Sequence, residues 1–109
     1  MSFDIDIGLT SLQGRRPRNE DFAGVQRPAA HELERGLVAA LADGVSQGED
    51  GLMAAQTTVM SLLTDFHATP PGWDASVALE RLLSQHNAWL LAHNRRSGRD
   101  ALSTLTALA

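Results

Sequence analysis

Hydrophobic and polar positions along the chain predict elements in the order strand, strand, strand, helix, helix, strand. Residues 3–9 alternate between apolar and small or polar side chains, which is typical of a half-buried strand. The apolar positions expected to face a core are Phe3, Ile5, Ile7 and Leu9. Residues 22–26 give a weaker strand pattern. Residues 36–42 are nearly all apolar, which favours a central strand covered on both faces.

Two connections separate these strands. Residues 11–18 contain Gly14 and Pro17, which indicate a loop. Residues 27–35 are polar and contain a proline, so we expect a hairpin-like connection that holds a short turn of helix.

The apolar period lengthens to three or four residues after Gly48, which predicts a helix with one apolar stripe. Its stripe consists of Leu52, Ala55, Val59, Leu62, Leu63 and Phe66. Residues 70–72, Pro-Pro-Gly, end this helix.

A second helix is expected to begin after Asp74 or Ser76, either of which can cap it, and to end at Gly98 in a left-handed conformation. Its apolar residues fall on adjoining faces, at Ala78, Leu79, Leu82, Leu83, Trp89 and Leu90. Residues 102–109 then alternate again, as in a strand. Strands followed by helices, without regular β-α-β alternation, predict an α+β fold.

His86 and His93 are seven residues apart and therefore share a face of the second helix. A metal site needs a further ligand, and no third candidate is evident near them. We therefore expect these histidines to be surface or packing residues.

Composition limits the function classes. The 109 residues form one domain or part of one, and a net charge of −4 argues against general nucleic-acid binding. The absence of cysteine excludes disulfides and thiolate zinc sites. The N-terminal residues are acidic and unlike a signal peptide, and no segment is long and apolar enough for a membrane span, so we expect a cytoplasmic protein.

The strongest chemical signal is the sequence Leu41-Ala42-Asp43-Gly44-Val45-Ser46, which follows the apolar run. A carboxylate at the end of a strand is held rigidly, and Gly44 allows the main chain to turn and a ligand to approach it closely. Oxygen ligands of this kind suit a hard divalent cation. The alternative is an ordinary Asp-Gly turn with no bound ligand.

A second cluster, Arg16-Pro17-Arg18-Asn19-Glu20-Asp21, precedes that turn. Carboxylates hold divalent cations, and a guanidinium binds a phosphate that such ions polarise. A calcium-binding loop starting at Asp43 is excluded because its third, fifth and twelfth positions would be Val45, Gln47 and Ala54. A phosphate-binding P-loop is excluded because the chain contains no lysine.

In these motifs and their order the chain resembles the type 2C metal-dependent protein serine/threonine phosphatases (PPM type), especially compact bacterial ones. Arg16-x-x-Asn19-Glu20-Asp21 is similar to the family's opening Arg-x-x-x-Glu-Asp motif. Asp43-Gly44, followed by Gly51-x-x-Ala54, resembles its metal-binding turn and the helix behind it. Residues 103–107, Ser-Thr-Leu-Thr-Ala, resemble a later Gly-Ser/Thr-Thr strand, so the likeness spans residues 9–109.

The resemblance implies a role for each matching residue. Arg16 would bind the substrate phosphate, and Glu20 would ligate one metal ion directly or through water. Asp43 would bridge two ions, Mg²⁺ or Mn²⁺, and Gly44 would offer its carbonyl oxygen to one of them. Asp21 would orient a metal-activated water, which attacks the phosphorus of phosphoserine or phosphothreonine on a protein substrate.

The family's later aspartate motifs would lie beyond Ala109, and Ala101-Leu102 stands where the family has glycine before its Ser/Thr-Thr pair. The resemblance therefore implies that residues 1–109 are the N-terminal half of an α-β-β-α sandwich, two antiparallel sheets flanked by helices. We expect this incomplete domain to be inactive alone and to self-associate through its exposed last strand.

Two other functions remain open. One is a catalytically inactive, phosphatase-like regulatory or protein-interaction domain. The other is a small α+β interaction domain whose acidic residues only form turns.

Overall fold

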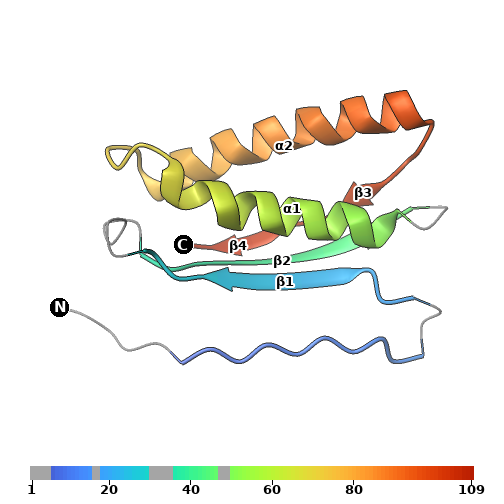
Figure 1. The fold of residues 1–109 in the computed structure, drawn as a ribbon, viewed down its shortest axis with the longest axis horizontal. Coiled ribbons are helices and arrows are strands. Elements are labelled where there is room, and N and C mark those ends of the chain that lie inside the picture. Colours follow the sequence, from blue (N-terminus) through green and yellow to red (C-terminus); the bar gives the residue numbers. More distant parts are fainter. Residues whose placement is uncertain (1–5, 16–17, 30–35, 47–49) are drawn as a thin grey trace.

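The chain folds as an α+β unit in which one antiparallel sheet packs against helices (Figure 1). The structure, a computed structural model, describes residues 6–15, 18–29, 36–46 and 50–109. The elements are β1 (Asp21–Gln26), β2 (Val38–Val45), α1 (Gly51–Asp65), the 3₁₀ turn η2 (Phe66–Ala68), α2 (Ala75–Ser97), β3 (Leu102–Ser103) and β4 (Thr106–Leu108). The predicted fold class is confirmed.

β2 is the central strand of the sheet. It pairs antiparallel with β1 on one side, and with β3 and β4 in succession on the other. β1 and β2 follow one another in sequence, so the predicted hairpin is confirmed, although residues 30–35 of its connection lie outside the described residues. The predicted strand over residues 102–109 is present but is interrupted at Thr104 and Leu105.

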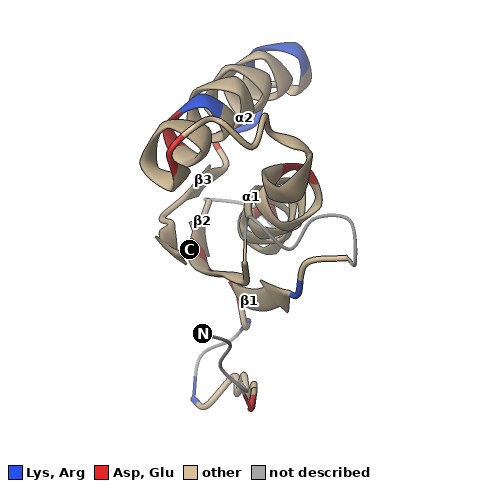
Figure 2. Cartoon of the chain, turned by 90° about the vertical axis from the view of Figure 1, so that its left-hand side faces the viewer, with Lys and Arg blue, Asp and Glu red and all other residues tan. Residues whose placement is uncertain are grey.

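α1 packs on one face of the sheet and α2 packs against α1 (Figures 1 and 2). The stripe predicted for the first helix is confirmed, since five of its six members are buried: Ala55, Val59, Leu62, Leu63 and Phe66. Alternate residues of β2 face them, namely Val38, Ala40 and Ala42. Gly24 of β1 lies directly below Val59 and Leu63, where a side chain would overlap them. These contacts form the main hydrophobic core.

α2 begins and ends close to where the sequence predicts. Asp74 occupies the N-cap position, although its side chain makes no capping hydrogen bond there. Gly98 closes the helix with φ 67°, a left-handed conformation that glycine adopts without steric cost. After this turn the Asn94 side chain bonds both main-chain groups of buried Ala101, accepting from its N–H at 3.2 Å and donating to its carbonyl at 2.9 Å. These two hydrogen bonds direct the chain from α2 into β3.

The strand predicted over residues 3–9 is wrong for its described part. Residues 6–9 belong to no strand, and Ile7 and Leu9 are exposed; Phe3 and Ile5 lie outside the described residues. Alternation of apolar residues describes which face a strand would bury, but a strand also needs a neighbour for its main-chain hydrogen bonds. None of the strands at the edges of the described sheet, β1, β3 and β4, pairs with this segment.

The prediction that the central strand is covered on both faces is also wrong. The burial of β2 alternates, because α1 covers one face only. On the opposite face Leu41 and Val45 are exposed, and a shallow groove of about 300 Å³ runs over this side of the sheet. The groove is lined by apolar residues that include Leu9, Ala23, Val25, Ala39, Leu41 and Leu108. No helix in the described part of the chain lies over this face.

We expect the open face to cause self-association of this chain. Leu41 is 54% exposed and Leu108 is 70% exposed, and contiguous apolar surface of this kind drives association in water. The double substitution Leu41→Gln and Leu108→Gln should raise the monomer fraction in analytical ultracentrifugation. Leu91→Gln, which changes an exposed leucine on α2, outside the open face, is the control. A parent chain that stays monomeric up to millimolar concentration would contradict this expectation.

Among the described residues, neither helix combines the length and the apolarity that crossing a membrane requires.

Candidate functional site

Two of the predicted site residues, Asp21 and Asp43, lie opposite each other on neighbouring strands. The adjacent Gly44 N–H donates to the Glu20 carbonyl at 2.9 Å. Hydrogen-bonded and non-hydrogen-bonded pairs alternate along an antiparallel ladder, so Asp21 and Asp43 form a non-hydrogen-bonded pair, whose side chains approach most closely. Like charges in this arrangement repel each other. The sequence therefore places a local excess of negative charge on one face of the sheet.

Asp43 lies within β2, whereas the sequence predicted that the strand ends before it. β2 continues through Gly44 to Val45, because both neighbours of Asp43 still pair across the sheet. Ala42 and Gly44 face α1, so Asp43 belongs to the opposite face. Its main chain is held by Thr104, which accepts from the Asp43 N–H through its hydroxyl oxygen at 3.0 Å and donates its own N–H to the Asp43 carbonyl at 2.9 Å.

Glu20 approaches from the side of α1. A Cβ atom at Gly51, the first residue of α1, would overlap the Glu20 carboxylate, and one at Gly44 would overlap the Gly51 carbonyl. These glycines therefore allow the start of β1, the end of β2 and the start of α1 to meet at one corner of the molecule. Negative charge is favoured beside the N-terminus of a helix, which stabilises the Glu20 carboxylate there.

Two buried carboxylate oxygens at this corner lack a hydrogen-bond partner among the described residues. They are Glu20 Oε2 and Asp43 Oδ1. Burying an unpaired polar or charged atom costs free energy, which a partner of opposite charge offsets. Hard divalent cations take oxygen ligands of this type, so each of the two oxygens is chemically suited to contact a metal ion.

The predicted ligands are nevertheless not gathered into one complete set. Across residues 6–15, 18–29, 36–46 and 50–109, no group of three or more His, Cys, Asp or Glu side chains is arranged to hold a metal ion. Strand alternation explains this: Glu20 lies on the side of α1, while its neighbour Asp21 shares the opposite face with Asp43. Arg16 lies outside the described residues, so its role in phosphate binding stays a prediction.

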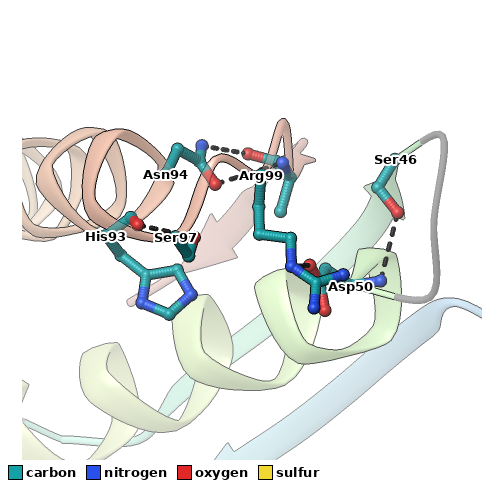
Figure 3. A network of polar contacts seen from close by, with 7 residues as sticks. Ser46, Asp50, His93, Asn94, Ser97 and Arg99 are labelled. Carbon is teal, nitrogen blue, oxygen red and sulfur yellow. Dashed lines mark hydrogen bonds and ion pairs between the residues drawn. The ribbon is translucent and has the colours of Figure 1, made fainter.

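A polar network closes the end of the molecule near this corner (Figure 3). Asp50, the N-cap residue of α1, donates its N–H to Ser46 Oγ at 3.1 Å. Its carboxylate lies 3.4 Å from Arg99 Nε, which follows α2. The network therefore connects the end of β2, the start of α1 and the end of α2, and within it the Asp50 carboxylate pairs with Arg99.

The two histidines of α2 form a packing cluster, as expected. The Trp89 ring stacks with His86 at 5.6 Å and with His93 at 5.3 Å between ring centroids, so one indole packs against both imidazoles. Thr58 Oγ1 donates to the Ala54 carbonyl at 2.6 Å and also lies within hydrogen-bond distance of His86 Nε2, at 2.9 Å. Burial lowers the pKa of His86 because it disfavours the charged imidazolium.

The same helix pair forms a groove that the sequence analysis missed. It has a volume of about 490 Å³ and is lined mainly by α1 and α2, with Met60, Leu82, His86 and Trp89 among its residues. The sequence did contain one signal for this groove. Trp89 lies three and four residues from His86 and His93, so the three rings share one partly polar face of the helix.

No family model matches the chain, and comparisons with characterised proteins and with solved structures find no match either.

Proposed function

We propose that this chain is the N-terminal part of a metal-dependent protein serine/threonine phosphatase. The observation that carries the proposal is the pair of buried carboxylate oxygens, Glu20 Oε2 and Asp43 Oδ1, which have no hydrogen-bond partner in the described part of the chain. They belong to the two acidic motifs whose order and spacing resemble that family. A divalent cation would offset the cost of burying them.

In this proposal Asp43 would hold Mg²⁺ or Mn²⁺ and bridge two such ions, and the Gly44 carbonyl would contribute to one of them. Glu20, on the side of α1, would reach one ion directly or through a water molecule. When bound, the cation lowers the pKa of a water molecule and neutralises charge on the phosphoryl group. Asp21, which lies opposite Asp43, accepts a hydrogen bond from the attacking water and orients it. Arg16 binds the phosphate of a phosphoserine or phosphothreonine through its guanidinium.

A second function, a phosphatase-like regulatory or interaction domain without turnover, is favoured by a different observation. In the part of the chain that the structure describes, no three acidic or histidine side chains form a metal-binding group. A domain with this fold and an incomplete ligand set would bind a partner without hydrolysing phosphate.

The proposal predicts that Mn²⁺ binds at the corner formed by β1, β2 and α1. Substoichiometric Mn²⁺ should broaden the amide NMR signals of Glu20, Asp43, Gly44 and Gly51 before all others. Asp43→Asn keeps the side-chain shape and removes the charge, so it should abolish this selective broadening. The matched control is Asp74→Asn, because Asp74 is exposed and makes no capping bond. Uniform broadening, or an Asp43→Asn variant that responds like the parent, would contradict the metal site.

Hydrolysis of p-nitrophenyl phosphate separates the two functions. We expect Mn²⁺-dependent turnover in a version extended along the coding sequence to include further carboxylates, and little in this chain alone. If Mn²⁺ binds at the corner but neither version hydrolyses the substrate, the regulatory function replaces the phosphatase.

A further inference from the structure

Thr104 lies opposite Asp43 at the point where the last strand is interrupted. The pairs Gly44–Ser103 and Leu41–Thr106 keep one register across the break between β3 and β4, which places Thr104 next to Asp43. Asp43 therefore has Asp21 on one side and Thr104 on the other. The interruption is not an inserted residue, so it needs another cause.

That cause is an exchange of hydrogen-bond acceptors. In a regular antiparallel pair of this type, each residue donates its N–H to the carbonyl of the other. Thr104 does donate its N–H to the Asp43 carbonyl, at 2.9 Å. The Asp43 N–H, however, donates to the Thr104 hydroxyl oxygen at 3.0 Å, and the Thr104 carbonyl accepts from Ser103 Oγ at 2.7 Å. A side chain thus replaces a main-chain group at this one position.

We propose that Thr104 is a positioning residue whose hydroxyl sets the conformation of Asp43 and thereby the direction of its carboxylate at the candidate metal centre. The proposal rests on the proposed function. The Asp43 N–H is fixed by the Thr104 hydroxyl, and the next N–H in the chain, that of Gly44, is fixed by the Glu20 carbonyl at 2.9 Å. The Cα atom that carries the carboxylate lies between these two anchors. Partners of this kind, one step removed from a ligand, strongly affect metal affinity.

Threonine suits this role for two physical reasons. Its β-branched side chain has few rotamers and fits an extended strand, so the hydroxyl is held in one direction at low entropic cost. The hydroxyl is also an acceptor that the main chain does not otherwise supply at this point. Valine has nearly the same shape and no acceptor, whereas serine keeps the acceptor and loses a methyl group. These two replacements separate hydrogen bonding from packing.

The test compares Thr104→Val, Thr104→Ser and the control Thr106→Val in this chain. Thr106 is exposed and lies two residues further along the same edge. Mn²⁺ affinity is measured by titrating the broadening of the Asp43 and Gly44 amide signals. We expect Thr104→Val to weaken Mn²⁺ binding about tenfold or more, and Thr104→Ser and Thr106→Val to stay within about twofold of the parent. Equal affinity in Thr104→Val and the parent, or a Thr104→Ser variant as weak as Thr104→Val, overturns the inference.

A metal-free measurement distinguishes this inference from the proposed function. The amide proton shift of Asp43 reports its hydrogen bond to the Thr104 hydroxyl without any ion. The Asp43 amide proton shift should change in Thr104→Val. In Thr104→Ser and in Thr106→Val it should keep the value of the parent chain. If the parent binds no Mn²⁺, the proposed function fails, and the Asp43 shift still decides whether Thr104 positions this residue: an unmoved shift in Thr104→Val overturns that role.

Discussion

Gly44→Ala is expected to destabilise the chain by about 3 kcal/mol or more, because the added methyl group would overlap main-chain atoms. A Cβ at Gly44 meets the carbonyl of Gly51, so β2 and the start of α1 would have to separate. Neither partner can rotate away, since both are main chain within regular elements. Urea denaturation followed by circular dichroism measures the loss directly.

Two other glycines give graded controls for this substitution. At Gly51 the added methyl group meets the end of the Glu20 side chain, which can rotate, so Gly51→Ala should cost clearly less than Gly44→Ala. At Gly72 nothing lies within 4 Å of the added atom, and Gly72→Ala should change the free energy of unfolding by less than about 0.5 kcal/mol. A Gly44→Ala variant as stable as Gly72→Ala would mean that β2 and α1 do not approach this closely.

Phe66→Ala is expected to cost about 3–5 kcal/mol, the usual range for removing a buried aromatic ring. Phe66 is fully buried where α1 passes into η2, and it belongs to the core between α1 and the sheet. Its ring also meets that of His67 edge to face, with 5.4 Å between centroids. Removing it leaves a cavity that the two rigid layers cannot close.

Met60→Ala is the matched control for Phe66→Ala. Met60 lies on α1 but is half exposed, so its truncation should cost less than about 1 kcal/mol. Thermal or urea unfolding of both variants gives the comparison. Equal losses would show that the core does not depend on the Phe66 ring.

The fold was predictable where one periodic pattern decided the outcome. The stripe from Leu52 to Phe66 defines α1, because burying it requires a helix with one face on a sheet. The region around Ile7 has an equally clear alternation, yet it forms no strand in the described residues. The difference is that a helix satisfies its own main chain, whereas a strand depends on a neighbour that its sequence does not specify.

The candidate site was predictable in its residues and not in their arrangement. Glu20 and Asp43 followed from acidic motifs in a given order, and the structure buries an oxygen atom of each. Their placement on different sides of the sheet depends on register, and a shift of one residue would reverse it. The bond from the Asp43 N–H to Thr104 joins residues far apart in the chain, which no local pattern indicates.

α2 is the helix that is attached to the rest of the molecule by the fewest buried residues. This helix buries only Ala78 and Leu90 among its described residues, so His86, bonded to Thr58 of α1, is one of its few specific anchors. The pKa of His86 is lowered in the folded state, so protonation favours the state in which α2 is detached. The contribution of His86 to the attachment of α2 therefore declines as the pH falls below 6.5, the ordinary pKa of histidine. We therefore expect α2 to open locally before α1 and the sheet as the pH falls, which hydrogen exchange at neutral and mildly acidic pH would measure.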